Sequence, residues 1–187
     1  MTTAQTNRAR RPFVLEEGVA ILARTPGTLD AMLRGLPDGW IRANEGDKTW
    51  SPFDVVGHLI HGERTDWMPR VKLILEHGES RAFDTFDRFA QFGASEGRSL
   101  DSLLDEFATV RRDNLGELAN LRLTAADLDR RGRHPAFGIV TLRQLLATWA
   151  AHDLDHVVQI SRVLARQYTN EVGPWTAYLR IISGEQG

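Results

Sequence analysis

The sequence contains no cysteine among its 187 residues. This absence excludes a disulfide framework, a thiolate zinc site, an iron–sulfur cluster and a cysteine nucleophile. Any metal that the chain binds must therefore be held by nitrogen and oxygen ligands. If the protein performs thiol chemistry, the thiol has to arrive with a substrate or a cofactor.

An excess of charge of one sign is also missing, as are long apolar runs. Lysine and arginine number 23 against 25 acidic residues, for a formal net charge of −2, which gives no basic footprint for nucleic acid. Only Lys48 and Lys72 are lysines, and we attribute the predominance of arginine to GC-rich codons. No segment approaches the roughly 18–20 consecutive apolar residues of a membrane span, and no apolar stretch of a signal peptide follows the N-terminal charges. We therefore expect a cytoplasmic protein that binds a small molecule and neither nucleic acid nor membrane.

The length of 187 residues is about that of one domain. We expect a flexible tail over residues 1–12 and a single domain over residues 13–187. Apolar residues recur at steps of three and four, which is the period of a helix. The predicted helices cover residues 15–36, 52–77, 100–118 and 142–166, and a short last helix follows Gly173-Pro174. The sequence thus predicts an all-α protein, a four-helix bundle with a short C-terminal helix.

The predicted helix boundaries have specific signals. Thr25-Pro26-Gly27 interrupts the first helix, and Pro69 is predicted to bend the second. Ser51 and Thr141 are predicted N-caps, because each is followed three residues later by a side chain that can complete a capping box. Residues 79–98 lack a period and are predicted to form a loop with one helical turn. No segment has the sustained two-residue alternation of a β-strand.

The predicted fourth helix places ionisable side chains on its core-facing side. Asp153 and His156 fall within its apolar stripe and His152 at the edge, where such groups are costly unless paired or bound. The two histidines are four residues apart, so both imidazoles project from one side and could bind one divalent cation. Histidines hydrogen-bonded to core carboxylates explain the pattern equally well. A metalloprotease motif is excluded, because Asp153 and not a glutamate follows the first histidine.

A metal site needs at least a third protein ligand, and the predicted second helix offers candidates. His58 and His61 lie on this helix, with Glu63 and Asp66 nearby. His58 lies off the main apolar stripe, so it could face a second neighbour or solvent, and the pattern taken alone favours an exposed histidine over a ligand. The pattern therefore leaves the identity of the third ligand open.

Two motifs resemble those of the DinB/YfiT-like superfamily. Trp50-Ser51-Pro52-x-Asp54-Val55-Val56-Gly57-His58-Leu59 resembles the second-helix motif of that superfamily. Leu145-Leu146-x-x-Trp149-x-x-His152-Asp153-x-x-His156-x-x-Gln159-Ile160 resembles its fourth-helix motif. Because the order, the spacing and the chain length also match, the resemblance covers nearly the whole chain. It implies an up-down-down-up bundle in which three histidines converge on a divalent metal, and it leaves His61 outside the family pattern. The implied ligands are His58, His152 and His156.

The resemblance also implies a class of activity. Members with known activity are similar to thiol S-transferases that use low-molecular-weight thiols such as bacillithiol, and a related group isomerises maleylpyruvate with mycothiol. We therefore expect a metal-dependent thiol S-transferase or hydrolase-type activity on a small electrophile, with a low-molecular-weight thiol as a candidate cofactor. The alternative is a non-catalytic, stress-related binding or scaffold protein on the same bundle. Imidazole ligands leave zinc, nickel, iron and manganese undistinguished, and a homodimer is a further expectation.

Two polar residues of the fourth helix are candidates for the surroundings of the metal. Asp153 is predicted either to orient a ligand imidazole or to bond an arginine or a backbone group. Gln159 could donate to a metal-bound species or cap the mouth of the bundle. The sequence supports the two roles of Asp153 equally, and for Gln159 it favours the capping role.

Aromatic and basic residues complete the set of candidates. Trp50 and Phe137 could line a pocket above the metal, whereas Trp67 and Trp149 are predicted to belong to the core. The arginines of residues 81–98 could bind an acidic thiol cofactor, although most such surface charges are solvated.

Overall fold

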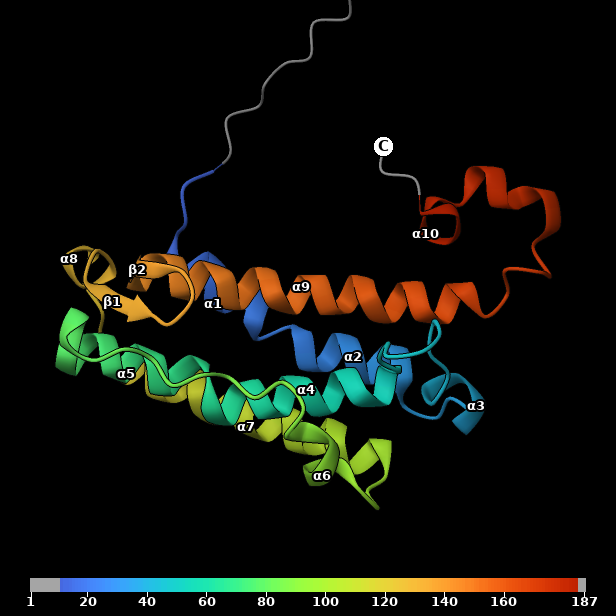
Figure 1. Ribbon diagram of the computed structural model, residues 1–187, viewed down its shortest axis with the longest axis horizontal. Helices are drawn as coiled ribbons and strands as arrows, with labels where there is room; N and C mark the ends of the chain where they lie inside the picture. The colour runs from blue at the N-terminus through green and yellow to red at the C-terminus, as the bar shows by residue number, and fades with distance from the viewer. Residues whose placement is uncertain (1–10, 185–187) are drawn as a thin grey trace, which may run out of the picture.

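In the computed structural model, which describes residues 11–184, the chain folds into a bundle of long helices (Figure 1). The α-helices are α1 (Leu15–Leu22), α2 (Thr25–Leu33), α3 (Asp38–Ile41), α4 (Pro52–Thr65), α5 (Trp67–His77), α6 (Gln91–Ser95), α7 (Leu100–Asn120), α8 (Ala125–Leu128), α9 (Leu142–Arg166) and α10 (Arg180–Ser183). The remaining elements are the 3₁₀-helices η1 (Gly78–Ser80) and η2 (Gly173–Tyr178) and the strands β1 (Arg131–His134) and β2 (Gly138–Thr141). The tail predicted over residues 1–12 lies outside the described residues except for its last two.

The long helices form four rods, made of α1 with α2, α4 with α5, α7, and α9. In Figure 1 the first and last rods run in one direction and the second and third rods run in the other. α4 packs against both α7 and α9, and α1 packs against α9. The predicted all-α, up-down-down-up four-helix bundle is confirmed.

Two predicted helices are interrupted, the first close to the predicted position and the second three residues before it. The first breaks before Pro26, which lies in the first turn of α2, where its missing N–H is not needed. The second breaks at Asp66 and not at Pro69. A proline ring clashes with the carbonyl group four residues before it. Because α4 ends at Thr65, Pro69 falls in the first turn of α5 and the clash is avoided.

The expectation that the chain contains no strand is wrong. β1 and β2 pair antiparallel around a turn at residues 135–137, with Arg131 opposite Thr141. Each strand has four residues, which is too short for a two-residue alternation to be recognised. The short helix predicted after Gly173-Pro174 is present, divided into η2 and α10, and Trp175 in it is 67% exposed.

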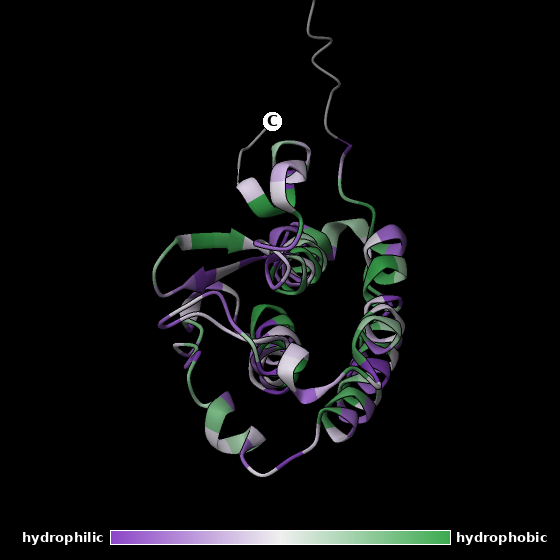
Figure 2. Ribbon diagram, turned by 90° about the vertical axis from the view of Figure 1, so that its right-hand side faces the viewer, coloured by the Kyte–Doolittle hydropathy of each residue, from purple (hydrophilic) through white to green (hydrophobic). Residues whose placement is uncertain are grey.

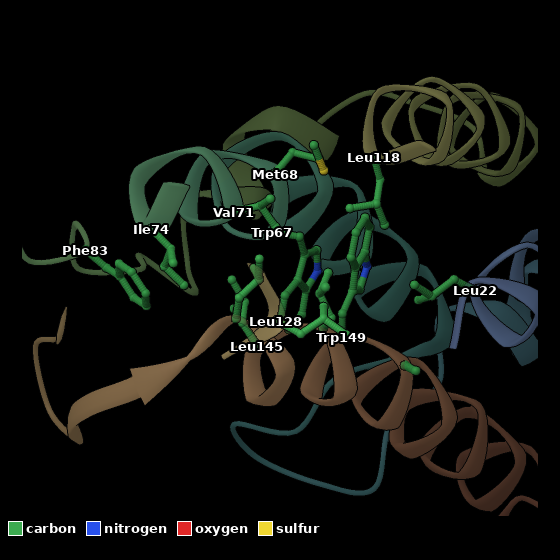
Figure 3. Close-up of a cluster of buried hydrophobic side chains, with 13 residues drawn as sticks. Leu22, Trp67, Met68, Val71, Ile74, Phe83, Leu118, Leu128, Leu145 and Trp149 are labelled. Atoms are coloured by element: carbon green, nitrogen blue, oxygen red, sulfur yellow. The ribbon is translucent and has the colours of Figure 1, made fainter. Parts of the chain in front are cut away.

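The bundle contains two hydrophobic clusters, separated by buried polar residues. One cluster, toward the hairpin, gathers around Trp67 and Trp149 (Figure 3). The other, toward α3, gathers around Phe53 and Phe107. Seen end-on, the helices carry both hydrophobic and hydrophilic residues, as expected of helices that bury one face (Figure 2). Within residues 11–184, no helix combines the length and the apolar character needed to cross a membrane.

Candidate metal centre

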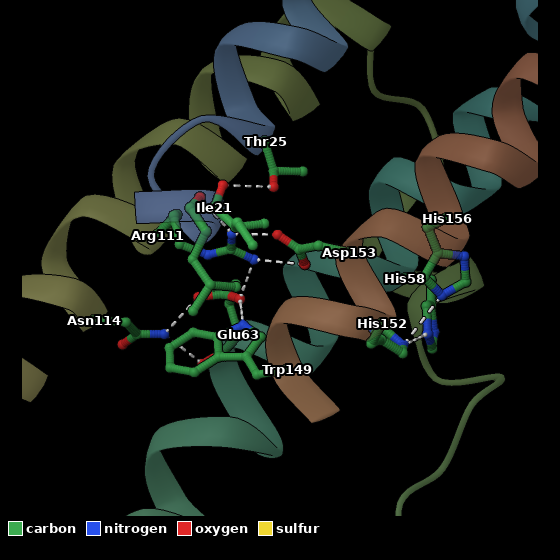
Figure 4. Close-up of polar contacts among 11 residues, drawn as sticks. Ile21, Thr25, His58, Glu63, Arg111, Asn114, Trp149, His152, Asp153 and His156 are labelled. Atoms are coloured by element: carbon green, nitrogen blue, oxygen red, sulfur yellow. Dashed lines mark hydrogen bonds and ion pairs between the residues drawn. The ribbon is translucent and has the colours of Figure 1, made fainter. Parts of the chain in front are cut away.

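Three histidine side chains from two neighbouring helices converge in the middle of the bundle (Figure 4). α4 carries His58, and α9 carries His152 and His156 one turn apart. The Nε2 atom of His152 lies 3.2 Å from Nε2 of His58 and 3.1 Å from Nε2 of His156. The starts of α4 and α9 are fixed by capping boxes at Ser51 and Thr141, as predicted. We call these three residues the histidine cluster.

The donor set of the histidine cluster fits a divalent cation. Bonds of about 2.0–2.1 Å from zinc to imidazole nitrogen place neighbouring nitrogens about 3.3 Å apart in a tetrahedral site, close to the observed separations. The ligand atoms of the histidine cluster all lie within 4.8 Å of one another. Among the described residues, no other group of three or more histidines or carboxylates has ligand atoms that converge in this way.

Burial keeps the three imidazoles neutral. The pKa of His58 is lowered to about 3 and that of His152 to about 4. In both cases burial is the largest cause, and the charge of the neighbouring His156 is the second. Burial also lowers the pKa of His156. A metal binds the neutral form of imidazole, so the histidine cluster is in the metal-binding form at pH 7.

Gln159 fixes the orientation of His156. The Nδ1 atom of His156 donates to Oε1 of Gln159 at a distance of 2.8 Å. Because an amide oxygen only accepts hydrogen bonds, Nδ1 carries the proton and Nε2 keeps its lone pair for the histidine cluster. The Nδ1 atoms of His58 and His152 are buried and have no hydrogen-bond partner in the described part of the chain. Gln159 therefore has a role different from the two considered for it, since it contacts an imidazole of the histidine cluster directly.

His58 is buried, although periodicity alone predicts an exposed residue. The residue is only 6% exposed. The ring of Trp50 lies 4.7 Å from its ring, and the ring of Phe86 lies 5.6 Å away. Phe86 belongs to the segment between η1 and α6, which covers this side of α4. A helical period reports burial by other helices, so it could not show burial by an irregular segment.

His61, the other candidate for the third ligand, lies outside the histidine cluster. Its ring packs against Phe86 at 5.0 Å, and its Nε2 atom is 3.5 Å from Oγ1 of Thr65. It is not among the converging ligand atoms of the described residues. The nearby acidic residues also have other partners, because Glu63 bonds buried groups and Asp66 pairs with an arginine one turn later.

Asp153 contacts an arginine and not an imidazole. Arg111 on α7 donates to the two carboxylate oxygens of Asp153 at 2.5 and 3.0 Å. It also donates to Glu63 at 2.7 Å and to the backbone carbonyl of Leu22 at 2.8 Å. Trp149 adds an indole N–H bond to Glu63 at 2.9 Å. This buried network joins α1, α4, α7 and α9 (Figure 4). Of the two roles considered for Asp153, the structure shows the bond to an arginine.

The partners of Asp153 were not predicted, yet the sequence contains a signal for both. Arg111 lies on the apolar stripe of α7, four residues after Phe107. Glu63 lies on the apolar stripe of α4, three residues after Ile60. Ionised groups on core faces require buried partners of opposite charge. Three such positions on three helices therefore indicate a shared ion-pair network.

The aromatic candidates divide between the core and the site. Trp67 and Trp149 are buried and stack at 5.7 Å, as predicted for core residues. Trp50 is half-buried and stacks on His156 with ring centroids 6.3 Å apart, so it borders the histidine cluster. Phe137 lies at the hairpin turn and is 78% exposed, so it does not line this site.

A cavity of about 740 Å³ opens beside the histidine cluster at His156. Its volume is in the range of small-molecule sites. The loop between α3 and α4, the segment around α6, and one face of α9 form its walls. Its other lining residues include Lys48, Trp50, Arg88, Phe89, Asp155 and Gln159.

Known proteins share this architecture. The structure of YfiT from Bacillus subtilis, described as a probable metal-dependent hydrolase with an unusual four-helix bundle topology, matches with a TM-score of 0.70 and 21% sequence identity. The match covers 84% of this chain and 92% of that one. A comparison with curated proteins gives no match. The family model described as the DinB superfamily matches residues 21–160, which carry the histidine cluster, and the chain therefore belongs to the DinB superfamily.

Proposed function

We propose that this protein is a metal-dependent enzyme in which His58, His152 and His156 bind one divalent cation. The observation that carries the proposal is the convergence of three neutral imidazoles, two of them buried and that of His152 half-buried, at the edge of a cavity. None of the three bonds a carboxylate of the described residues, which removes the structural explanation considered for the histidines of α9. Three protein ligands leave coordination positions open, as in catalytic metal sites.

The residues around the histidine cluster prepare it for chemistry. A bound divalent cation lowers the pKa of a water or thiol that coordinates it, and so supplies a nucleophile near neutral pH. Gln159 holds the proton of His156 at Nδ1, while Trp50 and Phe86 cover the imidazoles. The cavity admits a small electrophile beside His156. Because the chain has no cysteine, a thiol in this reaction comes from a cofactor or a substrate.

The proposed reaction transfers a small electrophile to a thiol or to water. The resemblance to thiol S-transferases supports a low-molecular-weight thiol as co-substrate. The description of YfiT as a probable metal-dependent hydrolase supports water. The nucleophile is a thiolate in the first reaction and a hydroxide in the second, and a divalent cation at the histidine cluster would activate either one.

Elemental analysis of protein purified without an affinity tag tests the metal. We expect a stoichiometric content of zinc, nickel, iron or manganese that is lost in His152→Ala and retained in His61→Ala. The second variant is a matched control, because it removes an imidazole next to the histidine cluster without changing the cluster itself. A metal content near zero in the wild-type protein would overturn the proposal.

Activity with model substrates tests the reaction. p-Nitrophenyl acetate in water reports hydrolysis, and a bimane electrophile with added 2-mercaptoethanol reports transfer to a thiol. We expect turnover in at least one assay that disappears on chelation and in His156→Ala. Stoichiometric metal with no turnover in either assay would favour the non-catalytic binding protein.

A further inference from the structure

The cavity beside the histidine cluster contains two cations that have no acidic partner. Lys48 and Arg88 line it, and neither forms an ion pair or a hydrogen bond with any of residues 11–184. Arg162 in the same cavity is different, because it bonds Glu45 at 2.8 Å. Asp155, on the α9 wall, forms no ion pair within the described range, although its charge helps to raise the pKa of Arg162. The walls outside α9 therefore present two cations free to meet a ligand.

The backbone at Lys48 is in the left-handed region, with a φ of 63°. Lys48 lies in a turn in which the N–H of Thr49 donates to the carbonyl of Gly46 at 3.2 Å. A side chain with a Cβ is strained in this conformation, which glycine and asparagine adopt more readily. Such strain is typical of functional positions. This turn places Lys48 at the wall of the cavity.

Trp50 connects these cations to the histidine cluster. The guanidinium carbon of Arg88 lies 5.5 Å from the centroid of the Trp50 ring. The same ring lies 4.7 Å from the ring of His58 and 6.3 Å from that of His156. One indole therefore lies next to both Arg88 and the imidazoles, and Phe89 adds apolar surface to the cavity. A small molecule that lies along this indole reaches from Arg88 to the histidine cluster.

We propose that Lys48 and Arg88 form an anion-binding subsite, and that the substrate is a small organic anion with an apolar body. Its carboxylate or phosphate bonds the two cations, its apolar part lies on Trp50, and its other end reaches the histidine cluster. Arginine presents paired donors to such oxygens, and lysine presents a compact charge. The assignment of the reacting end rests on the proposed function, whereas the anion subsite depends on Lys48 and Arg88 alone.

Phenylacetate is a suitable probe of this subsite. Phenylacetamide removes its charge, acetate removes its ring, and phenyl phosphate tests whether phosphate is preferred to carboxylate. Binding is followed by the indole N–H resonance of Trp50, assigned with Trp50→Phe, in both the metal-free and the zinc-loaded protein, while the exposed Trp175 serves as an internal reference. We expect phenylacetate to shift the Trp50 resonance in both forms. Phenylacetamide and acetate should bind at least about tenfold more weakly than phenylacetate.

Variants test the two cations separately. Lys48→Asn and Arg88→Gln are each expected to lower the affinity for phenylacetate about tenfold. Because asparagine tolerates the left-handed backbone, Lys48→Asn should lose this affinity while remaining at least as stable as the wild type. Lys72→Asn and Arg81→Gln are matched controls that remove exposed cations outside the cavity, and they should leave the affinity unchanged.

Three results would overturn the subsite. One is equal affinity for phenylacetate and phenylacetamide, and another is unchanged affinity in both Lys48→Asn and Arg88→Gln. The third is binding of phenylacetate only in the zinc-loaded protein, because the ion alone would then hold the carboxylate. If the protein binds no metal at all, the proposed function fails, and the metal-free measurements still decide the subsite.

Discussion

Arg111 and Asp153 form a two-bond ion pair in the centre of the bundle, with side chains only 1% and 0% exposed. The same guanidinium bonds Glu63 on α4. One arginine from α7 thus holds both helices that carry the histidine cluster. The stability of the protein and the geometry of its site depend on the same side chain.

Replacing Arg111 with methionine is expected to destabilise the protein by about 3–5 kcal/mol, because Glu63 and Asp153 would remain buried without a cation. Urea unfolding measures the change. Arg112→Met is the control, since Arg112 is exposed and should change the free energy of unfolding by less than about 0.5 kcal/mol. A similarly small effect of Arg111→Met would show that the network contributes little.

Replacing Gln159 with leucine is expected to weaken metal binding about 10–100-fold, because His156 loses the acceptor that fixes its proton. Gln159→Glu keeps an acceptor at this position and should bind the metal at least as tightly as the wild type. Competition with a chromophoric chelator measures the affinities. Gln167→Leu, at the C-terminal end of α9, should leave them unchanged. Wild-type affinity in Gln159→Leu would contradict the orienting role.

The metal-free protein is expected to lose stability as the pH falls below about 6.5. Burial lowers the pKa of His58 to about 3 and that of His152 to about 4, so below pH 6.5 the unfolded chain binds protons that the folded chain does not. The free energy of unfolding should therefore fall by up to about 1.4 kcal/mol per pH unit for each histidine, and it should level off above pH 6.5.

Urea unfolding between pH 8 and pH 5 measures this dependence. This pH range lies above the one in which most carboxylates titrate. His58→Leu should flatten the slope, and His77→Asn, at an exposed position, should not change it. A free energy of unfolding that stays constant from pH 7 to pH 5 would show that the histidines titrate alike in both states.

Replacing Gly57 with alanine is expected to lower the free energy of unfolding by about 1–3 kcal/mol, because it disturbs the contact between α4 and α6. The added Cβ would lie 2.5 Å from Oγ of Ser95 and 3.2 Å from Oε1 of Gln91. Adding Ser95→Ala to this variant should recover part of the loss, because the nearest atom is removed. Gly116→Ala on α7 meets nothing within 4 Å and should stabilise the protein through helix propensity by up to about 1 kcal/mol. Thermal unfolding compares the variants, and equal effects at both glycines would contradict the steric argument.

Local signals in the sequence were sufficient for the helices that carry the site. The capping boxes at Ser51 and Thr141 depend on residues three apart, so they could be recognised without knowledge of the fold. The pairing of His152 with His156 follows from one helical turn in the same way. The position of the break at Asp66 could not be predicted from such local signals. Pro69 disfavours a continuous helix but does not specify which earlier residue ends it.

Features that depend on distant segments needed the structure. Burial of His58 depends on Trp50 and Phe86, and the second of these lies in a segment without periodicity. The cavity beside His156 is likewise formed by three separate parts of the chain. The sequence pattern therefore indicates the types of residue in the site. It does not indicate which residues bury His58 or how the cavity is shaped.

The ion pair between Arg111 and Asp153 also sets the register of the bundle. Hydrophobic contacts are not directional, so they specify the position of α9 along its neighbours less strictly than directional bonds do. A slide of α9 by one turn, about 5.4 Å, would break both bonds between Asp153 and Arg111. A third helix therefore determines which residue of α9 lies opposite His58, and with it the spacing between imidazoles that come from separate helices.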